Sequence, residues 1–232
     1  MLLKKLTFLC AILPLTLTTL ACGDTDDDNG GEYTPATDYE RPAGSEEIVS
    51  NAELDEFVNN GLDVNEGLTP PNVAGTYAFD DADTIYSSSD IYPASEGGGC
   101  EYEETFTAGA SDDEVRVSAE GTGNCEYTAA ATNNFISGEG DCFTLYGEYE
   151  STFNECEFRV VRVFSACIED GTDDLISPRF AERMRGQDGT SCAGLVASGD
   201  LPDVGDIYIV EESDGRAPRV ELIDISDGVD EG

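Results

Sequence analysis

The chain has 232 residues, of which 50 are acidic and 11 basic, and its formal net charge at pH 7 is −39. Such a charge repels nucleic-acid phosphates and anionic lipid headgroups, so we exclude nucleic acid as a partner. The chain has no histidine, and its only lysines are Lys4 and Lys5, which removes Ser-His-Asp and Cys-His catalysis and, beyond residue 5, Schiff-base catalysis.

Residues 1–21 have the organisation of a secretory signal peptide. Lys4 and Lys5 give a positive start, and residues 6–21 are uncharged and end in small side chains. This apolar run is shorter than the ~20 residues of a membrane-spanning helix, and acidic residues follow it rather than Lys or Arg. We therefore predict a cleaved signal peptide over residues 1–21, with a membrane anchor helix as the alternative.

The end of this segment resembles the lipobox of bacterial lipoproteins. Ala21 directly precedes Cys22, and small or aliphatic residues lie upstream, although Thr19 stands where the family usually has Leu. The resemblance implies a lipidated Cys22 at the new amino terminus, and several acyl chains make a stable membrane anchor. It also implies an exported lipoprotein of the cell envelope, at the outer membrane on its periplasmic face or at the cell surface.

Six cysteines lie beyond Cys22, and Cys10 is removed with the signal peptide. The six are Cys100, Cys125, Cys142, Cys156, Cys167 and Cys192. An even number in an exported chain predicts three disulfides. Without histidine or a Cys-x-x-Cys pair, we expect no metal site. We expect sequential pairing, because the intervening stretches resemble neighbouring strands.

Four segments make up the predicted chain. Residues 1–21 are the signal peptide, and residues 22–46 are the lipidated cysteine and a disordered acidic tether, since few aliphatic residues are present to form a core. Residues 47–226 form a single disulfide-stapled β domain, and residues 227–232 are a frayed acidic tail.

A short helix is predicted over residues 51–60, near the start of the domain. Ser50 and Glu53 form a capping box, and Gly61 provides a left-handed stop. One apolar stripe runs along it, formed by Leu54, Phe57 and Val58. So short a helix requires a surface to pack against, and we expect that surface to be a sheet.

The rest of the domain reads as strands. Residues 73–79 alternate, and their Gly75-Thr76-Tyr77 resembles the opening of lipocalin-like barrels, in which a Trp stands at the place of Tyr77. Turns rich in Gly and Asn then recur about every ten residues, which predicts an antiparallel meander. Within it, residues 155–166 are expected to form a central strand covered on both faces. The predicted fold is therefore mainly β, an antiparallel meander closing into a barrel or barrel-like sheet, with one short N-terminal α-helix packed against it.

Two segments follow the meander, and the first of them allows more than one interpretation. Residues 179–185 suit either a strand or a short helix, and their arginines suit either an anion pocket or ion pairs with carboxylates, which we expect. The arginines are Arg179, Arg183 and Arg185. Residues 207–210 and 220–223 are predicted to form a closing hairpin.

The leading functional hypothesis is a non-enzymatic module without a cofactor, binding a small apolar or amphipathic ligand between its strands. Its candidate lining residues are Tyr77, Phe79, Tyr102, Phe106, Tyr127 and Phe143. The alternative is that these aromatic residues only fill a closed core. A second hypothesis is a structural or interaction lipoprotein whose acidic surface binds divalent cations weakly, for example at Asp80-Asp81-x-Asp83 or residues 170–174. A third is a hydrolase that uses two facing carboxylates in an open cleft.

Overall fold

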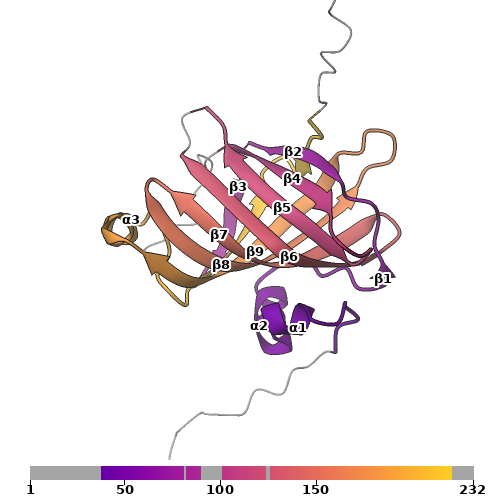
Figure 1. Cartoon of the computed structure of the whole chain (residues 1–232), viewed down its shortest axis with the longest axis horizontal. Helices are drawn as coiled ribbons and strands as arrows, with labels where there is room; N and C mark the ends of the chain where they lie inside the picture. Colours follow the sequence, from indigo (N-terminus) through magenta and orange to yellow (C-terminus); the bar gives the residue numbers. More distant parts are fainter. Residues whose placement is uncertain (1–37, 81, 90–100, 124–125, 221–232) are drawn as a thin grey trace, which may run out of the picture. The chain divides into compact units, whose positions relative to one another are not determined.

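The computed structural model describes residues 38–80, 82–89, 101–123 and 126–220, which contain three helices and eleven strands (Figure 1). The chain divides into two units, Met1–Tyr33 and Thr34–Gly232, and every described residue belongs to the second. The predicted signal peptide, Cys22, most of the tether, Cys100, Cys125 and the acidic tail lie outside the described residues.

The structure is mainly β, with one large mixed sheet. Its strand order is β2-β4-β5-β6-β7-β8-β9-β10-β3, while β1 pairs with β6 and β11 with β9. The strands are β1 (Leu68–Thr69), β2 (Gly75–Phe79), β3 (Ala82–Ser87), β4 (Tyr102–Ala108), β5 (Glu114–Gly121), β6 (Tyr127–Glu139), β7 (Cys142–Phe153), β8 (Cys156–Ile168), β9 (Leu175–Asp188), β10 (Ile207–Glu212) and β11 (Arg216–Ala217). From β4 to β10 each strand pairs antiparallel with the next one in the chain, which confirms the predicted meander.

The sheet curves strongly. Arg162 on β8 lies 3.3 Å from Glu104 on β4, yet three strands separate β8 from β4 in the strand order. Four steps between neighbouring strands span about 19 Å on a flat sheet, which is too far for these two side chains to meet. The face that carries both residues is therefore concave, and we call it the inner face.

Strand β8 is buried on both faces, as predicted for residues 155–166. Side chains alternate along a strand, so Val160 and Phe164 join the core cluster of the inner face. Val161 and Val163 join a second cluster on the opposite, outer face. The apolar pairs Val160-Val161 and Val163-Phe164, which show no clean alternation, thus follow from two separate layers of packing.

The outer-face cluster is completed by two helices, α1 (Ser45–Ile48) and α2 (Asn51–Asn59). The predicted helix and its capping box are confirmed: Ser50 accepts from the backbone N–H of Glu53, whose side chain accepts in return. Leu54 and Phe57 are buried, whereas Val58, the third member of the predicted stripe, is 37% exposed. The helical part of the domain begins two residues before the predicted boundary at residue 47, because α1 starts at Ser45.

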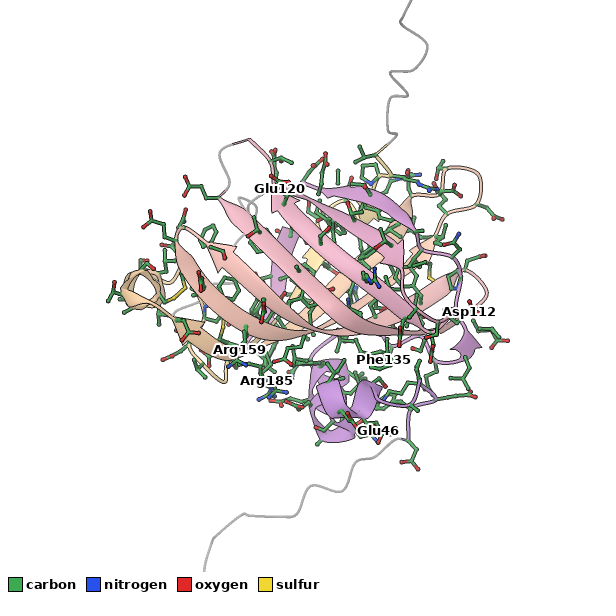
Figure 2. All side chains as sticks on the ribbon, in the orientation of Figure 1. Glu46, Asp112, Glu120, Phe135, Arg159 and Arg185 are labelled. Atoms are coloured by element: carbon green, nitrogen blue, oxygen red, sulfur yellow. A yellow bond between two sulfur atoms is a disulfide. The ribbon has the colours of Figure 1, made fainter. Side chains whose placement is uncertain are left out.

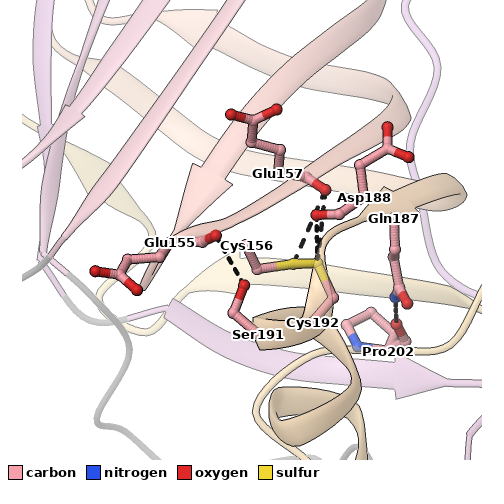
Figure 3. The surroundings of a disulfide bond; sticks show 8 residues. All are labelled: Glu155, Cys156, Glu157, Gln187, Asp188, Ser191, Cys192 and Pro202. Atoms are coloured by element: carbon pink, nitrogen blue, oxygen red, sulfur yellow. Dashed lines mark hydrogen bonds between the residues drawn. A yellow bond between two sulfur atoms is a disulfide. The ribbon is translucent and has the colours of Figure 1, made fainter.

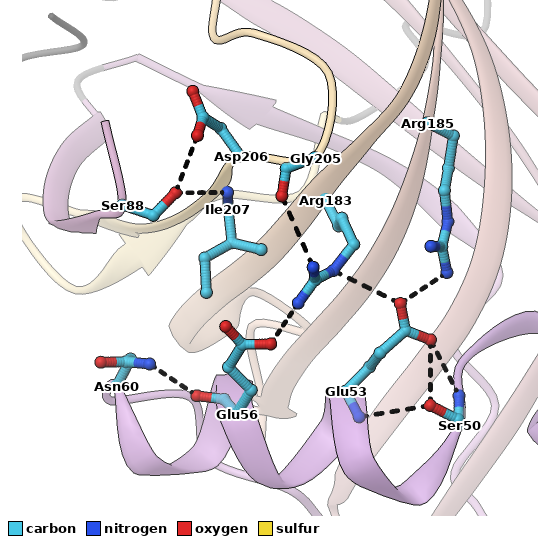
Figure 4. Close-up of polar contacts among 10 residues, drawn as sticks. All are labelled: Ser50, Glu53, Glu56, Asn60, Ser88, Arg183, Arg185, Gly205, Asp206 and Ile207. Carbon is cyan, nitrogen blue, oxygen red and sulfur yellow. Dashed lines mark hydrogen bonds and ion pairs between the residues drawn. The ribbon is translucent and has the colours of Figure 1, made fainter. Parts of the chain in front are cut away.

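Ion pairs fasten α2 to strand β9 (Figure 4). Arg183 pairs with Glu53 and Glu56, and Arg185 Nη2 lies 2.7 Å from the same Glu53. Arg179 pairs with Glu211 on β10 and with Asp63 after the helix. Residues 179–185 are therefore strand rather than helix, and their arginines pair with carboxylates as expected.

Two disulfides lie within the described residues, and their pairing is not sequential. Cys142 pairs with Cys167, because β7 and β8 form an antiparallel pair in which these residues are opposite each other. Cys156 pairs with Cys192 in helix α3 (Thr190–Ser198), because β9 returns the chain to the beginning of β8 (Figure 3). The expected sequential pairing is wrong for these four cysteines, since strand register and not chain order sets their neighbours.

The predicted closing hairpin is also wrong. Strand β10 pairs with β9 on one side and β3 on the other, so it is an internal strand with no edge left for a hairpin partner. Ile207 and Ile209 face the outer cluster, and Tyr208 and Val210 between and after them are buried as well, so this stretch is apolar on both faces. The chain beyond β11 instead runs beside β2, where Val220 N–H donates to Thr76 at 2.8 Å.

Candidate functional site

The six aromatic residues predicted to line a ligand site all belong to the inner-face cluster or pack against it. They contact one another: the rings of Phe79 and Tyr102 stack with centroids 4.9 Å apart, and those of Tyr77 and Phe106 lie 5.6 Å apart. Such packing favours the alternative that most of them fill a core. Phe106 also lines a hollow, described below.

An ionic cluster that the sequence analysis missed lies among these rings. Arg162 is only 4% exposed, and the exposed fractions of Glu104 and Glu182 are 0% and 1%. The Arg162 guanidinium donates to both carboxylates and, through Nη2, to the Tyr127 hydroxyl at 3.0 Å. It also lies over the ring of Tyr149, 4.5 Å from the centroid. One guanidinium thus donates hydrogen bonds to two buried carboxylates.

Cross-strand register builds this cluster. Arg162 on β8 is directly opposite Glu182 on β9, which is in turn opposite Tyr208 on β10. The Tyr208 hydroxyl donates to the second oxygen of Glu182. Each Glu182 oxygen therefore has a close donor, because three neighbouring strands place their side chains in one row on the inner face.

Glu104 is held much more loosely. Its oxygens lie 3.3 and 3.4 Å from Arg162 Nη1, and the Tyr149 hydroxyl is 3.5 Å away. Charge-assisted hydrogen bonds are usually about 2.7–2.9 Å long. Two residues earlier on the same strand, the hydroxyl of Tyr102 is buried without a hydrogen-bond partner among the described residues. The inner face therefore carries a weakly coordinated carboxylate beside an unpartnered hydroxyl.

Burial sets the protonation of the cluster. Desolvation raises the pKa of Glu104, Arg162 opposes that rise, and Glu182 adds to it. Desolvation likewise raises the pKa of Glu182 against the effect of Arg162. Desolvation and the charge of Glu104 raise the pKa of the Tyr102 hydroxyl well above its usual value. Because one positive charge faces two carboxylates, the cluster favours the uptake of a further positive charge.

The signal that could have found this cluster is a charged residue at an inward position of an apolar strand. Glu104 stands between Tyr102 and Phe106, Arg162 between Val160 and Phe164, and Glu182 between Phe180 and Met184. Alternation places each charge on the buried face. Which of the charges meet depends on the curvature of the sheet, and that is not local information.

Two hollows adjoin at one end of the sheet. The larger, of about 950 Å³, lies between the start of β2, the end of β4 and residues 171–174, and Arg219 and Phe106 are among its lining residues. The smaller, of about 490 Å³, lies between residues 68–74 and residues 107–115. Ala74 and Thr107 line both hollows. Volumes of this size suit small-molecule sites.

The opposite end of the sheet carries helix α3 (Figure 1). Cys192 in α3 is buried in the inner-face cluster, and Leu195 and Val196 pack against that cluster. The disulfide to Cys156 and a hydrogen bond from Ser191 to the carbonyl of Glu155 hold the helix in place. The apolar residues of α3 thus cover the inner-face core at the end away from the hollows.

The acidic stretch over residues 170–174 is used for ion pairs. Arg219 Nη1 lies 2.7 Å from Asp173, and Arg216 Nε lies 3.0 Å from Asp174. The backbone N–H of Arg219 donates to Asp174 and lowers the pKa of that carboxyl. Over the described ranges, no group of three or more Cys, Asp or Glu side chains is arranged to hold a metal ion. The candidate Asp80-Asp81-x-Asp83 cluster includes residue 81, which lies outside these ranges.

Most charged side chains instead point away from the core, as the stick view illustrates for Glu120, Arg159 and Asp112 (Figure 2).

Comparison of the chain with protein-family models, with curated proteins and with solved structures gave no match. In the part of the chain that is described, the helices are too short or too polar to cross a membrane. The assignment of a function therefore rests on the geometry of the inner face and its two ends.

Proposed function

We propose that this protein is an exported, lipid-anchored envelope protein that binds a small amphipathic ligand without catalysing a reaction. In this proposal Cys22 carries the anchor, the acidic segment after it is a tether, and the sheet closes as a lipocalin-like barrel. The ligand approaches the inner face at the end away from α3.

Closure of the barrel is supported by the ends of the strand order. The first and last strands, β2 and β3, are neighbours in the chain, with residues 80 and 81 between them. Residues 218–220 lie along β2 through the bridge between Tyr77 and Arg219, and β11 immediately before them pairs with β9. The chain thus links the first strands of the sheet to the last ones at two places.

The observation that carries the proposal is the pair of adjoining hollows that share Ala74 and Thr107. They lie next to Phe106, one of the predicted lining residues, while α3 covers the opposite end. A hydrolase is not favoured, because Glu104 and Glu182 are almost fully buried and bonded to Arg162 instead of facing an open cleft. Cation binding at residues 170–174 is disfavoured in turn by their pairing with Arg216 and Arg219.

The test is ligand capture by the full-length protein. The protein is purified from its own membrane in mild detergent, and native mass spectrometry compares the wild type with Thr107→Trp and Ser118→Trp. Thr107 lines both hollows, whereas the exposed Ser118 on β5 lines neither. We expect a small molecule bound to the wild type and to Ser118→Trp, and its loss from Thr107→Trp.

A second measurement uses N-phenyl-1-naphthylamine, a neutral apolar dye whose fluorescence rises on binding. The dye should bind the wild type with a one-to-one stoichiometry, and Thr107→Trp should weaken that binding about tenfold or more. The proposal is wrong if the native protein carries no small molecule and the dye does not bind, or if Thr107→Trp binds as the wild type does.

A further inference from the structure

We infer that the ligand carries a primary ammonium group, which is bound between the Glu104 carboxylate and the Tyr102 hydroxyl on the inner face. The inference rests on the proposed ligand-binding function and specifies the chemistry of the ligand. It is carried by three observations: the charge of the buried cluster, the coordination of Glu104, and the surroundings of Tyr102.

The first observation is charge. Glu104 and Glu182 are buried beside a single guanidinium, that of Arg162. An uncompensated charge in a protein interior costs several kcal/mol, so the cluster requires one further positive charge. Arg162 cannot supply it, because its guanidinium carries one charge and already donates to Glu104, Glu182 and Tyr127.

The second observation is the contrast between the two carboxylates. Both oxygens of Glu182 have close donors, from Arg162 and Tyr208. The three contacts of Glu104 measure 3.3–3.5 Å, longer than charge-assisted bonds usually are. The missing positive charge therefore belongs at Glu104 rather than at Glu182.

The third observation is the position of Tyr102. Its side chain is 7% exposed, its hydroxyl has no hydrogen-bond partner within the described ranges, and it stands two residues from Glu104 on the same face of β4. The ring of Phe79 stacks on it, and the ring of Tyr127 meets it edge-on at 5.6 Å. An ammonium group has three N–H donors, enough for the Glu104 carboxylate and the Tyr102 hydroxyl oxygen together. The surrounding aromatic rings also attract a cation.

A proton on Glu104 is the competing source of the same charge. Protonation would neutralise the cluster but leave the Tyr102 hydroxyl in the same aromatic surroundings, with no need for a cationic ligand. The two sources differ in one measurable respect, because only an ammonium site distinguishes an amine from an alcohol of equal length.

The experiment compares n-octylamine with n-octanol at pH 7 and 150 mM salt, by displacement of N-phenyl-1-naphthylamine from the full-length protein. We expect the wild type to bind the amine about tenfold more tightly than the alcohol, the size of one charge-assisted hydrogen bond in a buried site. Glu104→Gln should remove this preference and leave octanol binding unchanged. Tyr102→Phe should reduce the preference several-fold.

The control is Glu103→Gln, which removes the same charge from the neighbouring residue on the other face of β4 and should leave the preference intact. Equal binding of amine and alcohol by the folded wild type would overturn the inference while the proposed ligand-binding function stands, and would assign the charge at Glu104 to a proton. Displacement of the dye by neither compound would count against the proposed function itself.

Discussion

Arg162 Nη1 lies 3.3 Å from Glu104 Oε1, so a residue in the middle of β8 is paired with one on β4 across the concave side of the sheet. This ion pair forms only when the sheet is fully curved, because neither side chain reaches the other on a flat one. Arg162 thus joins the two halves of the sheet through its interior.

Replacement of Arg162 by Met should lower the free energy of unfolding by about 3–5 kcal/mol, because two buried carboxylates lose their compensating charge. Urea unfolding followed by circular dichroism at pH 7 measures this. The control is Arg159→Met on the same strand, where the guanidinium is 53% exposed and 3.8 Å from Glu148, so the loss should stay below about 1 kcal/mol. Equal losses in the two variants would contradict the structural role of the cluster.

Stability should also depend on pH through Glu104. The folded state raises the pKa of Glu104 above the ordinary 4.5, so the folded chain binds this proton more tightly than the unfolded one. The resulting stabilisation is present below pH 4.5 and is lost as the pH rises through the folded pKa. The titratable groups that interact with Glu104 are Tyr102, Tyr127, Tyr149, Arg162 and Glu182.

Glu104→Gln should therefore melt at a higher temperature than the wild type above pH 5, with a difference that grows as the pH increases and then levels off. Thermal melts from pH 4 to pH 8 measure it. Glu103→Gln changes the net charge equally and controls for the general repulsion of an acidic protein. If the two variants show the same pH dependence, burial of Glu104 has no effect on its proton affinity.

Glu53 joins the helix cap to the sheet, because its side chain completes the capping box at Ser50 and pairs with Arg183 and Arg185. Glu53→Ala should cost about 1–2 kcal/mol of unfolding free energy, the sum of a cap and partly exposed ion pairs. The loss should shrink in 1 M salt as the ion pairs are screened. Glu47→Ala, in the exposed part of α1, is the control and should change stability by less than about 0.5 kcal/mol.

The Cys156–Cys192 disulfide should determine whether α3 stays packed. It closes a stretch of 36 residues, and its removal as Cys156→Ser with Cys192→Ser should cost about 3 kcal/mol. We expect thermolysin to cut α3 near Leu195 at least ten times faster in that variant. The matched control removes Cys142–Cys167, which lies at the other end of β8 and should leave α3 protected. Equal protection of α3 in both variants would show that its packing is independent of the disulfide.

The parts of the fold that the sequence predicts are those that local interactions determine. The capping box at Ser50 and Glu53 involves residues three apart, and the double burial of β8 follows from its consecutive apolar pairs, Val160-Val161 and Val163-Phe164. The meander follows because each turn connects adjacent strands. These features need no knowledge of the distant parts of the chain.

The parts that the sequence could not predict depend on register and curvature. Cys142 meets Cys167 because the register of β7 and β8 places them opposite each other, and Cys156 meets Cys192 because β9 runs the full length of β8. The candidate site is similar: Glu104 and Arg162 are 58 residues apart, and they meet because the sheet is curved. Alternation shows that both side chains are buried, but it does not show that they are partners.

The positions of β2 and β3 at the two ends of the strand order bear on whether separate molecules can pair strand to strand at high concentration. An exposed sheet edge offers unpaired backbone N–H and C=O groups to any neighbouring molecule. Here the end strands are short, and along β2 the hydrogen bonds from Ala78 to Pro218 and from Val220 to Thr76 occupy the outer edge. Because its outer edge is occupied in this way, β2 offers little backbone for strand pairing with another copy, even where many molecules are concentrated.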